Sequence, residues 1–152
     1  MTSTLKRALA GAILLTTAVA AAGPALGAGK MLKVFSAEGC ECCHLWIAHM
    51  KSAGFSVNGE VIDYNRLDTM KQEAGLEPEQ TSCHTAFIDG YVIEGHVPAR
   101  EVERLLAERP NARGLAAPGM PAAAPGMDMG DDPYDVLLIH KDGTSEVYAS
   151  YR

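Results

Sequence analysis

Gly39-Cys40-Glu41-Cys42-Cys43-His44 is the stretch on which the organisation of this chain depends. It brings three thiols and an imidazole into five consecutive positions, and an apolar segment that contains Trp46 follows directly. The apolar segment indicates that the cluster opens a helix at the edge of a core. A helix N-terminus carries unpaired N–H groups and a partial positive charge, which lower thiol pKa values and favour the thiolate. The stretch therefore predicts either a site for a soft metal or a reactive dithiol.

Three chemistries suit these thiols. Cys40 and Cys43 have the C-x-x-C spacing of dithiol oxidoreductases, but Cys42 would compete with them as a third attacking thiol. Zinc sites usually separate paired ligands by two to four residues, so adjacent cysteines suit one tetrahedral ion poorly. Cu(I) prefers soft sulfur ligands, and adjacent thiolates can bridge two or more such ions. Copper binding, dithiol exchange and zinc binding all stay open at this point, in that order of preference.

The fourth cysteine, Cys83, lies forty residues beyond Cys43 and is also followed by a histidine, His84. Four cysteines in a small exported chain would by default form two structural disulfides. A bridge within 40–43 closes almost no loop and gives little entropic stabilisation. Purely structural disulfides are therefore the weaker interpretation.

The order of predicted elements indicates one α/β domain. Strands are expected at 31–35 and across 55–62, with Gly59 as a candidate bulge, and helices at 42–53 and from an Asn65 cap to 74. A hairpin follows about Asp89-Gly90, with strands at 83–88 and 91–93, and then a helix with Pro98 at its first position. Strand, helix, strand, helix, hairpin, helix is the order of a thioredoxin-like α/β sandwich with a cysteine motif at the start of its first helix. In that fold the loop before the third strand lies beside the first helix, so Cys83 is expected to join the cluster.

The C-terminal part of the chain has a different composition. Its Pro, Gly and Ala content predicts an extended, mobile segment from about residue 114 to 132, with Met120, Met127 and Met129 as soft copper ligands or as mere composition. Residues 133–152 contain two strand-like runs about Lys141-Asp142-Gly143, which predict a β-hairpin added to the edge of the sheet.

The N-terminal segment resembles a secretory signal. Lys6 and Arg7 precede an apolar run, and residues 25–28 offer a cleavage site, so residues 1–28 are predicted to be removed on export and residues 29–113 to form the metal-binding domain. Without Lys6 and Arg7, eleven of the thirteen basic residues remain against nineteen acidic ones, a formal charge of −8. No basic patch is left for nucleic acid or an anionic membrane.

Several side chains near the cluster have competing interpretations. His44 is either a ligand or exposed to solvent, and His49, on an apolar stripe with Cys42, Leu45 and Trp46, is expected to be a hydrogen-bonded core histidine. Trp46 is expected in the core. Strand alternation would direct His84 away from Cys83.

Together these motifs resemble the CopG-like periplasmic copper proteins, a thioredoxin-like family that long carried only a domain-of-unknown-function label. The motifs that carry the resemblance are Gly39–Cys43 with Trp46 and His49, Ser82–Ala86, Gly90-Tyr91, Glu94–Pro98, Pro118–Pro121 and Pro125–Met127. The resemblance implies copper bound by Cys40, Cys42, Cys43 and Cys83 and a role in copper resistance, with copper redox chemistry as an option. We therefore expect a periplasmic protein that holds more than one Cu(I), partnered by a copper efflux or chaperone protein. The rival hypothesis is a thiol–disulfide oxidoreductase that uses Cys40 and Cys43.

Overall fold

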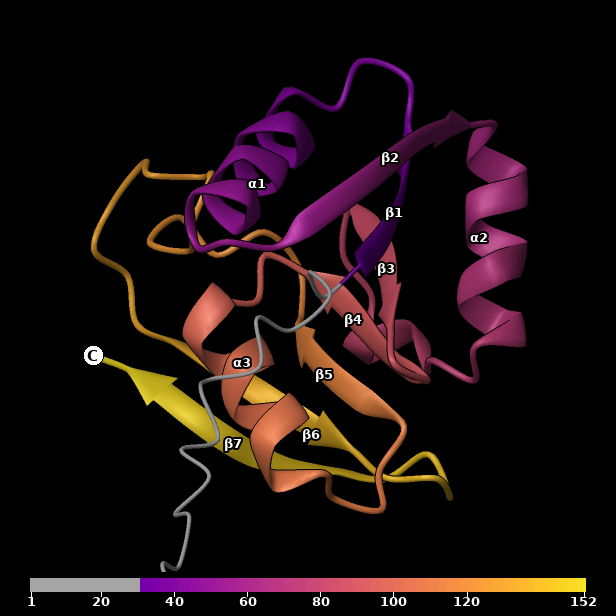
Figure 1. The fold of residues 1–152 in the computed structure, drawn as a ribbon, viewed down its shortest axis with the longest axis vertical. Coiled ribbons are helices and arrows are strands. Elements are labelled where there is room, and N and C mark those ends of the chain that lie inside the picture. The colour runs from indigo at the N-terminus through magenta and orange to yellow at the C-terminus, as the bar shows by residue number, and fades with distance from the viewer. Residues whose placement is uncertain (1–30) are drawn as a thin grey trace, which may run out of the picture.

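A mixed seven-stranded sheet forms the centre of the molecule in the computed structural model, which describes residues 31–152 (Figure 1). The predicted signal segment, residues 1–28, lies outside the described residues. The strand order is β2-β1-β3-β4-β5-β6-β7, with β2 parallel to β1, β5 parallel to β4, and the other neighbours antiparallel. The elements are β1 (Met31–Ala37), α1 (Glu41–Ser52), β2 (Ser56–Ile62), α2 (Tyr64–Glu73), a 3-10 turn (Pro78–Gln80), β3 (His84–Ile88), β4 (Tyr91–Gly95), α3 (Ala99–Glu108), β5 (Gly114–Ala117), β6 (Tyr134–Ile139) and β7 (Ser145–Tyr151).

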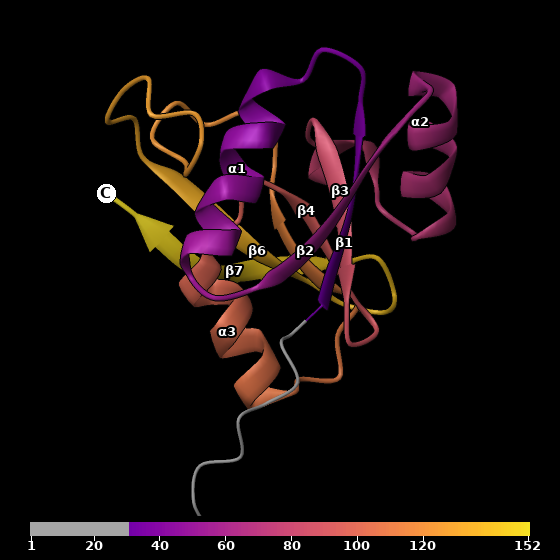
Figure 2. The same ribbon diagram turned by 45° about the horizontal axis from the view of Figure 1, so that its top comes forward.

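The three helices cover the sheet unequally. α1 and α3 lie on one face and α2 lies on the other, as the two ribbon views show together (Figures 1 and 2). The main core lies between the sheet and the α1–α3 layer. α1 contributes Cys43, Trp46 and Met50, whereas Leu45 is exposed, so the predicted stripe through Cys42 and Leu45 is wrong by about one position. The helix turns the whole side chain of Trp46 inward, and its Nε1 donates to the Val97 carbonyl at 2.8 Å, which confirms Trp46 as a core residue.

The predicted order of elements through α3 is confirmed, and the boundaries differ in instructive places. β2 runs without interruption and pairs Gly59 regularly with Val34, so there is no bulge. α2 is capped by Asp63, whose Oδ1 accepts from the N–H groups of Asn65 and Arg66, because this carboxylate can reach the free donors of the first turn. Pro98 is the residue before α3 and not its first helical residue.

The interior face of α2 also differs from the predicted one. Leu67 is buried as expected, but Met70 and Ala74 are only half-buried, and Lys71 is buried beside Leu67. A lysine one turn after a buried leucine lies on the same helix face, and here that face meets a buried carboxylate on β4. The ion pair of Lys71 with this carboxylate, Glu94, therefore accounts for a buried position on α2 that the hydrophobic pattern did not predict.

The segment from residue 114 differs most from its expected form. Residues 114–117 form β5, which is buried along its whole length, and an added Cβ at Gly114 would collide with the Val92 backbone. Residues 118–130 then fold back in turns instead of extending. Ala124 is fully buried. Gly126 lies so close to α1 that an added Cβ would meet the backbone nitrogen of Trp46 at 2.6 Å. β6 and β7 form the predicted C-terminal hairpin, and β7 is the sheet edge.

Within residues 31–152, no helix has the length and apolar character needed to cross a bilayer.

Candidate metal centre

The first helix begins in the cysteine cluster. Gly39 has φ = 77°, a left-handed conformation that suits glycine, and it turns the chain from β1 into α1. Cys40 is the N-cap residue and its side chain makes no capping hydrogen bond, so its sulfur is free for other contacts. Cys43 is fully buried and is joined to Cys40 by a disulfide, with their Cα atoms 5.3 Å apart. The predicted C-x-x-C pair is therefore geometrically competent to be oxidised.

Cys83 reaches the cluster from the loop before β3. Its Sγ lies 4.0 Å from Cys42 Sγ, and Cys42 Sγ lies 3.7 Å from Cys40 Sγ. All four cysteine sulfurs lie within 4.8 Å of one another. The structure thus confirms the expected proximity of Cys83. Adjacency of α1 and the β3 loop, and not sequence spacing, creates this four-sulfur group.

Two imidazoles flank Cys83 on its other side. His84 Nδ1 lies 3.4 Å from the Cys83 sulfur and His96 Nε2 lies 3.1 Å from it, and the three ligand atoms are within 4.8 Å of one another. The prediction that His84 points away from Cys83 is wrong, because β3 begins at His84 and strand alternation does not extend to the loop residue before it. His96 follows the end of β4, and its Nδ1 donates to the Pro125 carbonyl at 2.8 Å.

Burial dominates the protonation of these groups. It raises the pKa of the Cys83 thiol to about 12, with the neighbouring Cys42 as the next cause. Burial also lowers the pKa of His96 and lowers that of His84 well below its ordinary value, where His96 and Lys71 add repulsion. In the metal-free state at neutral pH, both imidazoles are therefore neutral and the Cys83 thiol is protonated. A thiophilic metal ion would displace the Cys83 proton.

The family described as "Protein of unknown function, DUF411" matches residues 80–127. Two solved structures, both of the copper resistance protein CopG, match over most of the chain. Form 1 has 38% identity and a TM-score of 0.76, with 81% of this chain and 98% of that chain covered, and Form 2 has 36% identity and a TM-score of 0.75, with 82% and 99% covered. The chain belongs to the CopG family. No curated protein matches it.

The sulfur cluster of this CopG relative rests on a buried ion pair. Lys71 Nζ lies 2.5 Å from Glu94 Oε1 and 2.9 Å from Thr85 Oγ1, and the Thr85 hydroxyl donates to Glu94 Oε2 at 2.7 Å. Glu94 Oε1 also accepts from the Ser82 N–H at 2.7 Å. Burial raises the pKa of Glu94, and the surrounding donors oppose that rise. The carboxylate thereby fixes the backbone next to Cys83.

Ser82 is held from a second direction as well. Its hydroxyl donates to the Gly119 carbonyl, and the Gly119 N–H donates to the Thr81 carbonyl at 2.9 Å. Gly95 permits this arrangement, because an added Cβ there would come within 2.5 Å of the Ser82 side chain. The loop that carries Cys83 is therefore anchored to both β4 and the segment after β5.

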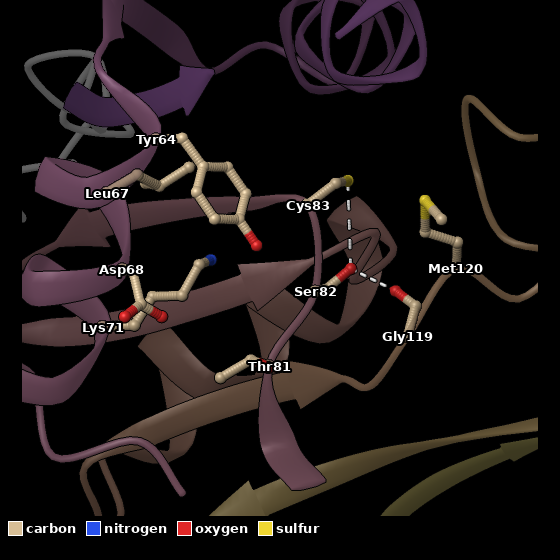
Figure 3. Close-up of a pocket in the computed structure, with 9 residues that line it drawn as sticks. All are labelled: Tyr64, Leu67, Asp68, Lys71, Thr81, Ser82, Cys83, Gly119 and Met120. Carbon is tan, nitrogen blue, oxygen red and sulfur yellow. Dashed lines mark hydrogen bonds between the residues drawn. The ribbon is translucent and has the colours of Figure 1, made fainter. Parts of the chain in front are cut away.

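A pocket of about 340 Å³ adjoins Cys83. Figure 3 shows the Lys71 ammonium and the Tyr64 hydroxyl turned toward each other on one side, and Met120 beyond Cys83 and Ser82 on the other. The lining residues are Tyr64, Leu67, Asp68, Lys71, Thr81, Ser82, Cys83, Gly119 and Met120. Met120 is 60% exposed, so its thioether borders both the pocket and solvent.

The remaining candidate ligands lie in different environments. His44 is exposed at the start of α1 and belongs to neither group of clustered ligand atoms among residues 31–152. Met129 is 77% exposed, whereas Met127 is half-buried and packs against the core. His49 is a core-edge histidine as expected, since its Nε2 accepts from the Ala99 N–H at 3.1 Å and so tethers α1 to the start of α3.

Sequence reasoning missed His96, Lys71 and Glu94 as parts of this region. His96 lies thirteen residues after Cys83 and carries no motif spacing that would link the two. Glu94 and His96 lie in the Glu94–Pro98 motif of the family resemblance, which could have indicated a role for them, whereas Lys71 looks like an ordinary surface charge in the sequence. Only cross-strand pairing of Thr85 with Glu94 reveals that this carboxylate lies inside the molecule.

Proposed function

We propose that this protein is an exported, thioredoxin-like copper-binding protein that holds Cu(I) in its cysteine cluster and serves copper resistance. One observation carries the proposal: the sulfurs of Cys40, Cys42, Cys43 and Cys83 lie within 4.8 Å of one another in a chain that is 38% identical to a copper resistance protein. The order β1-α1-β2-α2-β3-β4-α3, with the cysteines at the start of α1, supports the thioredoxin-like assignment.

The donor set favours copper over harder ions. Four thiols offer soft ligands, which select Cu(I). Among residues 31–152 the clustered ligand atoms also include two imidazoles and no carboxylate. The thioether of Met120 borders the adjoining pocket. Sulfurs 3.7 and 4.0 Å apart can each bridge two ions, so the cluster accommodates more than one Cu(I). Binding by all four sulfurs requires the Cys40–Cys43 pair in its reduced form.

Cu(I) binding capacity tests this proposal. The reduced mature protein is expected to bind more than one Cu(I) in competition with a chromophoric Cu(I) chelator, since adjacent thiolates bridge. Cys42→Ser should lower the number of ions bound and not merely their affinity, because Cys42 lies between Cys40 and Cys83. A limit of one ion in the wild type refutes the multinuclear site, and no binding at all refutes the proposed function.

A second candidate function is thiol–disulfide exchange. The disulfide between Cys40 and Cys43 at a helix N-terminus favours it, because that position stabilises a thiolate leaving group. Copper cycling would combine both chemistries, because oxidation of the Cys40–Cys43 dithiol to the disulfide releases two protons and the two electrons that reduce two Cu(II) to two Cu(I). A thiol titration separates the candidates: protection of the thiols by copper supports the copper site, and rapid catalytic reduction of a disulfide substrate supports exchange.

The three methionines after β5 are proposed as an auxiliary copper-capturing group. Met120 and Met129 are exposed, and thioethers suit Cu(I). Replacing Met120, Met127 and Met129 together with leucine should slow copper uptake while the free energy of unfolding changes by less than about 1.5 kcal/mol, because Leu and Met have similar volumes. Stopped-flow transfer from a Cu(I) chelate measures the rate.

The matched control for the methionines is Met31→Leu, an exposed methionine at the start of β1. Unchanged transfer kinetics in the triple variant would leave these residues with a purely structural role.

Export to the periplasm and delivery to an efflux or chaperone protein complete the proposal. Localisation of the full-length chain by cell fractionation tests the proposed export.

A further inference from the structure

We propose that Cys83, His84 and His96 form a metal site of their own, which binds one soft monovalent ion while Cys40 and Cys43 are joined in a disulfide. The inference rests on the proposed copper function and adds a second, histidine-containing site to it. Cys83 belongs to both sites, so oxidation of the C-x-x-C pair would change the ligands of an ion without expelling it.

The structure contains the Cys40–Cys43 disulfide together with the Cys83, His84 and His96 ligand group. With Cys40 and Cys43 bonded to each other, neither offers a thiolate, and the four-sulfur group loses half of its donors. The Cys83, His84 and His96 ligand atoms still lie within 4.8 Å of one another. An intact ligand group therefore coexists with the oxidised pair.

The distances suit one ion. Bonds of about 2.0 Å to nitrogen and 2.3 Å to sulfur place neighbouring donors about 3.5 Å apart in a tetrahedral or trigonal shell. The Cys83 sulfur lies 3.1 Å from His96 Nε2 and 3.4 Å from His84 Nδ1. Both sulfur–nitrogen distances are therefore within a few tenths of an ångström of the required value, and the two nitrogens lie within 4.8 Å of each other.

His96 is oriented as a metal-binding histidine is. A carbonyl oxygen can only accept, so the hydrogen bond to Pro125 places the proton of the neutral ring on Nδ1. The lone pair of Nε2 then faces Cys83. Such a bond from the far nitrogen fixes the ring and raises the basicity of the ligating one. Pro125 belongs to the segment after β5, which thus supports the site through its backbone.

His84 supplies the second imidazole and closes the site from the core. Its ring is fully buried and lies 4.4 Å from the Trp46 ring, centroid to centroid. Nδ1 faces the Cys83 sulfur, and Nε2 makes no hydrogen bond among the described residues. The short distance from Nδ1 to the Cys83 sulfur makes Nδ1 the ligand atom of His84, and the ring proton then lies on Nε2.

Ag(I) titration of the oxidised protein tests the site. Ag(I) is a soft monovalent ion that does not reduce the disulfide under these conditions, and mass spectrometry verifies that Cys40–Cys43 stays bonded. One equivalent should bind, with changes in the imidazole ¹⁵N shifts of His84 and His96. His96→Gln, which keeps a donor for the Pro125 carbonyl, should weaken binding by at least about tenfold. His140→Gln, at the end of β6, is the matched control and should leave binding unchanged.

Cys42→Ser distinguishes this site from a simple two-thiol site made by Cys42 and Cys83. The oxidised Cys42→Ser protein should still bind one Ag(I) with the same histidine shifts. Loss of binding in Cys42→Ser with retention in His96→Gln would overturn the proposal. An oxidised wild type that binds no Ag(I), beside a reduced wild type that binds several Cu(I), also overturns it and leaves the proposed copper function standing. Failure of both proteins to bind removes both.

Discussion

Replacing Glu94 with glutamine is expected to lower the free energy of unfolding by about 3 kcal/mol, the lower end of the cost of leaving a buried charge without its partner. Glu94 is fully buried and Lys71 is 6% exposed, so the lysine would keep its charge without a counter-ion. The lower end applies because Lys71 also lines the pocket beside Cys83 and can turn its ammonium toward water. Urea denaturation of the metal-free protein measures the change.

A double variant shows that the lysine charge is the cause. Lys71→Met combined with Glu94→Gln removes both charges, and the loss should shrink to about 1 kcal/mol, since neutral replacements of buried pairs are well tolerated. Glu60→Gln is the matched control, because the Lys33–Glu60 pair is half-exposed, spans 3.9 Å and contributes less than about 1 kcal/mol. Equal losses in the single and double variants would show that the carboxylate matters only as a hydrogen-bond acceptor.

If the proposed copper site is correct, replacing Cys83 with serine is expected to reduce Cu(I) affinity by more than about a hundredfold, because loss of a metal ligand exceeds the tenfold to hundredfold cost of losing a partner that merely orients one. Cys83 touches Cys42 and both histidines, so it is the shared donor of all the clustered ligand atoms. Chelator competition on the reduced protein measures the affinity. The fold should survive, since Cys83 is only half-buried and the change is nearly isosteric.

Thr81→Ala is the control for a purely local disturbance of this loop. The Thr81 hydroxyl donates to the Pro78 carbonyl and lies two residues from Cys83, so its loss should change Cu(I) affinity less than about threefold, or roughly 0.7 kcal/mol. Intact Cu(I) affinity in Cys83→Ser would confine the metal site to residues 40–43. A large loss in both variants would indicate that the loop conformation, and not the thiol, sets the affinity.

The hydrophobic pattern alone predicted much of this fold. Strand β1, helix α1, the hairpin about Asp89-Gly90 and the C-terminal hairpin were all expected from local sequence, because periodicity and turn residues act over a few positions. Asp89 and Gly90 have φ values of 49° and 86°, the paired positive values that such a two-residue turn requires. Even the approach of Cys83 to the first helix followed from the order of elements.

Local composition failed where distant backbone sets the requirement. Residues 114–117 looked like the start of a flexible segment because they lead into a stretch rich in proline, glycine and alanine. In the structure they form a buried strand paired with β4, and the Val92 backbone approaches too closely for any side chain at Gly114. Gly126 has the same explanation against Trp46. The sequence alone does not distinguish a glycine that a close backbone contact requires from a glycine that a turn requires.

The sequence by itself determined the cysteine cluster, its place at a helix start and the α/β order that brings Cys83 to it. Only the tertiary structure decided that His96 joins Cys83, that Pro125 orients His96 and that Lys71 meets Glu94 beneath the loop. The physical reason is range. Thiol chemistry and helix starts are read from neighbouring residues, whereas burial and hydrogen-bond partners are set by strand register and packing between segments 13 to 29 residues apart.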